Sequence, residues 1–144
     1  MSSALDRLKD LTAKISSYEL ARKENMQVLR RLYETLQIDE KVPDFDDLFA
    51  FKAINLSGIS LAADDLCAVK EGRYAQIIAI TYDKSSAVKN KNSSLGYFGR
   101  AEKLDAAKKE AIVSFVLRWR FEKSFRTLEH YHTMIGSLGT DRNA

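Results

Sequence analysis

Apolar residues recur at helical spacing over the first quarter of the chain, which contains no Pro or Gly before residue 38. Steps of three and four residues between apolar positions are typical of one face of an α-helix. A seven-residue repeat holds in two blocks and is interrupted between them at Glu19 and Arg22. Because Ser16 and Glu19 have the spacing of a capping box, the pattern predicts either two helices, over residues 3–15 and 17–37, or one long kinked helix. The positions of the repeat are Leu5, Leu8, Ile15, Met26, Leu29, Tyr33 and Leu36.

This repeat is compatible with two structural roles. Apolar positions of a heptad repeat pair helices in a coiled coil, so the seven residues are candidates for self-association. Each block holds only about two good heptads, however, and short repeats of this kind also pack on a protein's own core. The repeat therefore predicts either a homo-oligomer or protein-partner contact, or an internal helix face.

The centre of the chain predicts further helices. A proline ends the first helical region, and Asp44 is a typical N-cap for a helix over residues 45–56. Ser60 is a typical cap for the next helix. Residues 73–83 are rich in strand formers, and for residues 73–86 the alternative to a helix is a hairpin at about 66–82. Since an isolated hairpin is marginal in water and no convincing third strand is evident, we expect a buried helix.

The longest apolar face lies near the C-terminus, from about residue 100 to residue 135. Its width is typical of a central helix that is covered by its neighbours. Two glycines indicate the end of this helix, and residues 136–144 are predicted to form a flexible tail. The elements together predict a single, mainly α domain over residues 1–144, a bundle of about five to six helices. The alternative is an α+β fold with one hairpin at about 66–82.

Composition narrows the classes of function. A chain of 144 residues with one Cys and two His cannot build a familiar zinc site by itself. His130 and His132 lie about 200° apart on a helix, so they cannot share one metal. Phosphate-binding glycine loops and the Cys-x-x-Cys and His-Glu-x-x-His motifs are missing from the sequence. We therefore expect no catalytic residue, metal or cofactor, and an uncharacterised enzyme with carboxylates from separate helices is the second alternative.

The compartment is predicted from two features. The chain opens without a signal-peptide pattern, and uncharged runs such as residues 74–82 are far shorter than the roughly 20 residues that span a bilayer. Cys67 stands alone among apolar neighbours, which is typical of a buried thiol in a reducing compartment. We expect a cytoplasmic, intracellular protein with no membrane partner.

Positive charge is concentrated in the second half of the chain. Residues 70–126 hold 13 Lys and Arg against 6 Asp and Glu, whereas residues 1–69 hold 9 against 12. Within the basic part, residues 89–103 combine cations, glycines and adjacent aromatics in a predicted loop. Cations neutralise phosphates and exposed aromatic rings stack on bases, so nucleic-acid binding is the first alternative function. The candidate residues are Lys89, Lys91, Tyr97, Phe98, Arg100, Lys103, Arg120 and Lys123.

The same charges also have internal explanations. Tyr97 and Phe98 can fold back on the core as a hydrophobic plug while the lysines keep the loop solvated. Four residues of the last helix alternate in sign at helical spacing and can pair with one another. They are Arg118, Glu122, Arg126 and Glu129. The sequence therefore predicts, as its first function, a non-enzymatic helical interaction or assembly module that self-associates or binds a protein partner.

Overall fold

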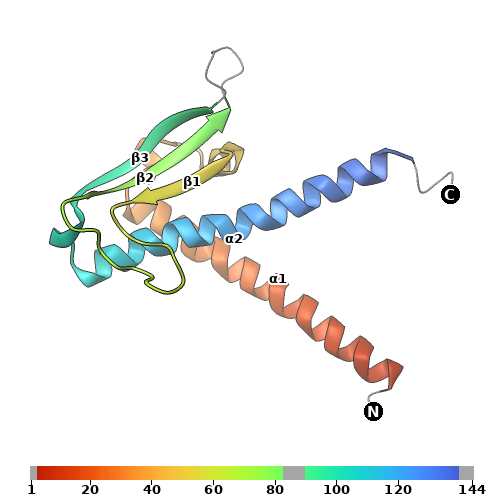
Figure 1. Cartoon of the computed structure of the whole chain (residues 1–144). Helices are drawn as coiled ribbons and strands as arrows, with labels where there is room; N and C mark the ends of the chain where they lie inside the picture. Colours follow the sequence, from red (N-terminus) through yellow and green to blue (C-terminus); the bar gives the residue numbers. More distant parts are fainter. Residues whose placement is uncertain (1–2, 83–89, 140–144) are drawn as a thin grey trace.

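The computed structural model describes residues 3–82 and 90–139, which form two long α-helices and one three-stranded antiparallel sheet (Figure 1). The helices are α1 (Ala4–Thr35) and α2 (Ala106–Ser137). The strands are β1 (Ala53–Ser57), β2 (Tyr74–Tyr82) and β3 (Asn90–Arg100), with β2 in the centre. Three short 3-10 segments connect them: η1 (Ile38–Glu40), η2 (Phe45–Ala50) and η3 (Ala101–Lys103).

The N-terminal region is one continuous helix. Ser3 begins α1 with a capping box, because its hydroxyl accepts a hydrogen bond from the Asp6 amide and the Asp6 carboxylate accepts one from the Ser3 amide. The chain leaves the helix at Gln37, which has a left-handed backbone with φ 59°. The break in the repeat at Glu19 and Arg22 therefore does not divide the helix.

The predicted bundle of five to six helices is wrong, because the fold is α+β. The segment expected as a buried helix contains β2, in which Ala75, Ile77 and Ala79 are buried in strict alternation. Alternation of this kind is the signature of a strand with one face on the core. The alternative hairpin at 66–82 is also misplaced, since the hydrogen-bonded neighbours of β2 are β1 and β3.

The sequence predicted neither of the two strands that pair with β2. Residues 45–56 were expected to be a helix, but only η2 is helical there, and β1 follows it. Asp44 does cap this segment, since its carboxylate accepts a hydrogen bond from the Asp46 amide. Residues 89–103 were expected to be a loop, yet residues 90–100 form β3, which pairs along most of β2, and η3 follows it. Ser60 accepts a hydrogen bond from the Ala62 amide without starting a helix.

The core lies between the sheet and the two helices. α2 carries the widest buried face, as expected for a central helix. Its Trp119 indole donates a hydrogen bond to the carbonyl of Leu48 at 2.8 Å, and the Lys123 ammonium donates to that of Phe49 at 2.7 Å. These two bonds fasten η2 to α2. The largest fully buried side chains are Phe115, Leu29, Ile38, Leu48, Ile54, Ile59, Ile77, Ile112, Glu122 and Val116.

α1 and α2 cross beside the sheet and then diverge, so that both ends of the described chain lie on the same side, away from the sheet (Figure 1). We call residues 4–21 the α1 arm and residues 127–138 the α2 arm. The rest of the described chain, with the sheet and the packed parts of both helices, is called the head. The fold thus has two helical arms that project from one packed head.

Candidate assembly surface

The crossing of the helices is held by one buried carboxylate. Glu122 of α2 has a side chain only 2% exposed. Arg22 of α1 donates two hydrogen bonds to it, from Nε at 2.7 Å and from Nη2 at 3.0 Å, and Arg126 donates a third at 2.9 Å. Arg22 also donates to the exposed Glu129 and lies over the ring of Phe125. A bidentate arginine pair of this kind fixes orientation as well as contributing energy.

Electrostatics at the crossing follow from this geometry. Burial alone would raise the pKa of Glu122, but the hydrogen bonds from Arg22 and Arg126 outweigh it and hold the pKa below its usual value. The Glu122 partner likewise raises the pKa of Arg22. On the same helix, burial followed by the nearby Arg126 charge lowers the pKa of Lys123. The carboxylate is therefore ionised and matched by cations at neutral pH.

A second pair of side chains completes the crossing. The Asn25 amide donates to the Arg118 backbone carbonyl at 2.9 Å, and its oxygen accepts from the Arg118 guanidinium at 3.2 Å. Arg118 is steadied within its own helix by a hydrogen bond to Ser114 at 2.8 Å. At the crossing, hydrogen-bond donors of each helix are thus paired with acceptors of the other.

Beyond the crossing, the α1 arm carries an exposed apolar row. Positions 8, 15, 22, 29 and 36 recur every seventh residue along α1. Leu29 and Leu36 of this series are buried in the head, whereas Leu8 is 60% exposed. Leu11 and Tyr18, three residues after positions 8 and 15, are also more than half exposed. The face that packs on the core in the head therefore continues along the arm without a covering partner among the described residues.

The α2 arm carries a second exposed row. Leu128 is 66% exposed and Leu138 is 71% exposed, and three further large apolar side chains between them are about half exposed. These are Tyr131, Met134 and Ile135. Large contiguous exposed apolar patches are typical of interaction surfaces.

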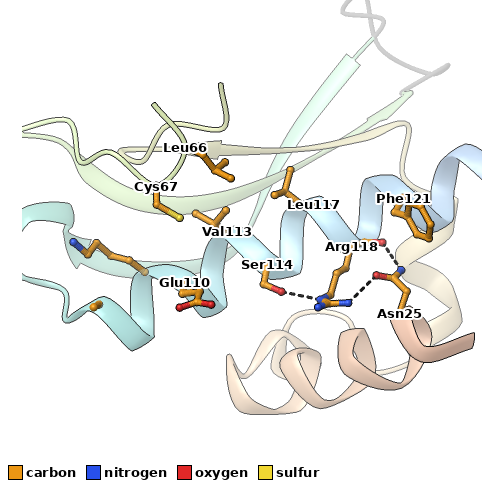
Figure 2. Close-up of a pocket in the computed structure, with 11 residues that line it drawn as sticks. Asn25, Leu66, Cys67, Glu110, Val113, Ser114, Leu117, Arg118 and Phe121 are labelled. Atoms are coloured by element: carbon orange, nitrogen blue, oxygen red, sulfur yellow. Dashed lines mark hydrogen bonds between the residues drawn. The ribbon is translucent and has the colours of Figure 1, made fainter. Parts of the chain in front are cut away.

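An open groove of about 660 Å³ lies where the α2 row enters the head (Figure 2). Figure 2 shows Leu117 and Phe121 of α2 on one side and Leu66 and Cys67 on the other, with the hydrogen-bonded Asn25–Arg118 pair at the end toward α1. Cys67, expected to be a buried thiol, is partly exposed in the groove wall. The groove lining is mainly apolar, so it extends the apolar row of the α2 arm into the head.

The predicted self-association residues lie partly in the core of the head and partly on the exposed α1 arm. Leu29, Tyr33 and Leu36 are core residues of the single chain, and Met26 packs partly against them. Leu5 and Leu8 are exposed on the α1 arm. The side chain of Ile15 lies outside the described residues. The second block of the repeat therefore packs in the core of the head, and the leucines of its first block are exposed on the α1 arm.

The predicted nucleic-acid residues do not form one cluster. Arg120 donates to the carbonyl of Ile54 and to the side chain of Asn55, and Lys123 is bonded to η2, so both are engaged within the fold. Phe98 packs partly against the core, with Lys108 over its ring. The remaining candidates are Lys91, Tyr97, Arg100 and Lys103, which are exposed, and Lys89, which lies outside the described residues.

Sequence reasoning missed the two residues that fix the crossing. Arg22 appeared only as an interruption of the repeat, and Asn25 was not singled out. The alternating charges on α2 did indicate the Glu122–Arg126 pair, which forms as expected at i, i+4. Two polar residues spaced by three on an otherwise apolar helix face were the available signal for a polar contact with another helix.

None of the protein-family models, curated proteins or solved structures with which the chain was compared matches it. Of the helices in residues 3–82 and 90–139, none is both long enough and apolar enough to span a membrane. The same two ranges hold no group of three or more His, Cys, Asp or Glu side chains suited to a metal ion.

Proposed function

We propose that this protein is an assembly module that self-associates through its two helical arms. The observation that carries the proposal is the exposure of ten large apolar side chains on the arms of one chain. They are Leu5, Leu8, Leu11, Tyr18, Leu20, Leu128, Tyr131, Met134, Ile135 and Leu138. Burying a side chain of this size contributes about 1.5–3 kcal/mol when it is fully exposed beforehand.

The energetic requirement for association supports the same proposal. Association costs about 4–15 kcal/mol in lost translational and rotational freedom. Because the arm side chains are about half to two-thirds exposed, covering several of them in each subunit offsets a cost of that order. The Arg22–Glu122 contact also holds the two helices at a fixed crossing before any partner arrives, which reduces the ordering cost of binding.

Light scattering after size exclusion tests the proposal over a series of protein concentrations. The expected mass is that of a dimer or larger assembly, which dissociates on dilution. Leu8→Glu and Leu128→Glu should each favour the monomer by at least about 100-fold in Kd, because each places a charge in the apolar contact. Their helical circular dichroism should match that of the wild type, since both positions are exposed.

Ala13→Glu is the matched control for this experiment. Residue 13 is exposed on the α1 arm on the side of Leu20, about 140° around the helix from Leu8 and about 160° from Leu11, so the same new charge should weaken association much less than Leu8→Glu does. A wild-type protein that stays strictly monomeric from about 1 to 100 µM would refute the proposal.

A second candidate function, binding of single-stranded nucleic acid, rests on the sheet face turned away from the core. Tyr74 and Tyr97 lie on that face, since Tyr74 and Gln76 alternate with buried residues of β2 and Tyr97 pairs with Gln76. Their ring centroids are 5.6 Å apart and both rings are more than half exposed. Arg100 pairs with Tyr74 in the sheet register, and its guanidinium forms a salt bridge with Glu102 at 3.2 Å. Stacking on such rings contributes about 1–3 kcal/mol per base.

Titration of a labelled oligonucleotide at two salt concentrations tests this second function. Tyr97→Ala should weaken binding by about 10-fold, whereas Tyr131→Ala on the α2 arm, which removes a tyrosine of similar exposure, should not. Binding should also weaken as salt rises, because phosphate contacts release counterions. Lack of binding at low salt, or equal effects of both variants, would exclude this sheet face as a nucleic-acid site.

A further inference from the structure

The apolar row of α2 lies on a different helix face from the one that α1 crosses. α1 contacts α2 through the carbonyl of Arg118 and the carboxylates of Glu122 and Glu129, which recur at helical spacing on one face. Leu117, Phe121 and Leu128 each precede one of these contact residues by a single position. One residue turns an α-helix by about 100°. The α1 helix of the same chain therefore leaves the apolar row of α2 open.

This row and the groove form one continuous track. Leu117 and Phe121 line the groove, and Leu128, Ile135 and Leu138 continue from it along the α2 arm. Phe121, Leu128 and Ile135 are spaced by seven residues, which is the repeat of a helix that packs lengthwise against another helix. At about 1.5 Å per residue, the track from Leu117 to Leu138 extends for roughly 30 Å.

We propose that the α1 arm of a second copy of this chain occupies the track, and that the two copies exchange these arms reciprocally. The α1 arm has the required repeat, since Leu8 and Ile15 are spaced by seven residues, and its length of about 27 Å matches the track. Leu8 and Leu11 of the α1 arm are exposed in the single chain, and so are Leu128, Ile135 and Leu138 of the track. This proposal rests on self-association through the arms and specifies which arm meets which.

One carboxylate of the groove can pair with cations of the α1 arm, although the groove lining also holds Lys109 and the Arg118 side chain that is bonded to Asn25. Arg7 and Lys14 each precede a position of the α1 row and are exposed. Glu110 lines the groove, is exposed, and has no salt bridge among residues 3–82 and 90–139. The two cations can therefore flank the docked row on the side where this carboxylate is available. Reciprocal exchange also closes the assembly at two copies, because each track and each α1 arm is used once.

Opposite charges placed on the two arms test the exchange. Leu11→Glu on the α1 arm and Leu128→Lys on the α2 arm should each weaken self-association by at least about 100-fold when present alone. An equal mixture of the two variants should restore a dimer. In the exchanged heterodimer one contact is wild type and the other pairs Glu with Lys. Sedimentation velocity or light scattering measures the recovery.

A mixture of Leu11→Glu with Leu11→Lys is the matched control. In the exchanged dimer both substitutions face an unchanged α2 track, so this mixture should stay monomeric. Recovery in the control mixture without recovery in the first would overturn the exchange and would instead indicate α1–α1 pairing. A wild-type protein that is monomeric throughout would overturn the assembly function itself, so the two failures are distinct. Unchanged circular dichroism of each variant confirms that the head remains folded.

Discussion

The two halves of α1 follow the same seven-residue repeat but lie in opposite environments. Leu29 is fully buried in the head, whereas Leu8, three repeats earlier, is 60% exposed. Nothing in the local helix pattern distinguishes the two leucines, since they occupy equivalent positions of the repeat. The difference comes from the head: α2 crosses α1 at Arg22 and Asn25 and then diverges from the first half, whereas η1 and η2 also lie against the second half. A periodic face therefore indicates that a contact exists and leaves open which surface provides it.

The largest expected difference is between the two leucines themselves. Leu29→Ala should lower the free energy of unfolding by about 3 kcal/mol, because it leaves a cavity in the head. Leu8→Ala should lower it by less than about 0.5 kcal/mol in dilute protein, because its side chain is already exposed. Urea unfolding followed by fluorescence measures both. Equal losses in dilute protein would contradict the division of α1 into a packed half and an arm.

The stability losses of Leu8→Ala and Leu29→Ala should also depend differently on protein concentration. If the arms are covered by a second copy, concentrated wild-type protein is stabilised by association. Leu8→Ala should remove part of that additional stability, whereas the deficit of Leu29→Ala should appear at every concentration.

The crossing provides the next largest effect. Glu122→Gln should lower the free energy of unfolding by about 3 kcal/mol, because Arg22 and Arg126 lose a buried carboxylate. Glu129→Gln is the control, since Glu129 also bonds Arg22 but its side chain is 63% exposed, and the expected loss is below about 1 kcal/mol. Thermal and urea unfolding measure both losses. Similar values would show that the buried carboxylate is no more important than the exposed one.

Acid should weaken the contact between Glu122 and its two arginines at the crossing. The pKa of Glu122 is lower in the folded chain than in the unfolded chain, where a glutamate titrates near 4.3. Its contribution to stability is therefore complete above that pH and is lost as the pH falls through the lower folded pKa. The stability difference between the wild type and Glu122→Gln should narrow over this range. A difference that stays constant down to about pH 2 would exclude ionised Glu122 as the cause.

The caps of the two helices give the smallest effect. Asp105 begins α2 in the head, where its carboxylate accepts a hydrogen bond from the Lys108 amide at 2.7 Å. Asp105→Ala should lower the global free energy of unfolding by about 1 kcal/mol. Ser3→Ala removes the cap of the α1 arm and should fray only its first turns, which hydrogen exchange detects without a shift in the global transition. A global loss from Ser3→Ala would mean that the arm unfolds together with the head.

The long helices were predictable from sequence, but the sheet was not. The spacing of apolar residues identified α1 and α2 because each has a strong period over many turns. The first half of β3 contains only Asn, Lys and Ser, so it has no apolar alternation to identify it. Its pairing with β2 is a long-range hydrogen-bonded contact, which side-chain periodicity does not record. Without β3 as a neighbour, β2 was assigned to a helix.

The candidate surface was predictable in part for a similar reason. The repeat identified Leu8 and Leu29 together, because both follow one helix face. It could not separate them, since burial depends on where α2 crosses. Arg22 was recognised as a break in the repeat, but its role required Glu122, which is 100 residues away in the chain. Arg120 and Lys123 were candidates for anion binding until the fold supplied backbone carbonyls as their partners.

α1 continues through the crossing without a break. The face that the α1 arm presents is therefore set by the number of residues between the arm and the head, because each residue turns the helix by a fixed angle. One alanine inserted between Ala21 and Arg22 would turn the whole arm by about 100° about its axis while every contact of Arg22 is kept. Seven inserted residues would return it almost to its first orientation and extend its reach by about 10.5 Å. Reach and orientation are thus separate variables, adjustable by the length of a single helix.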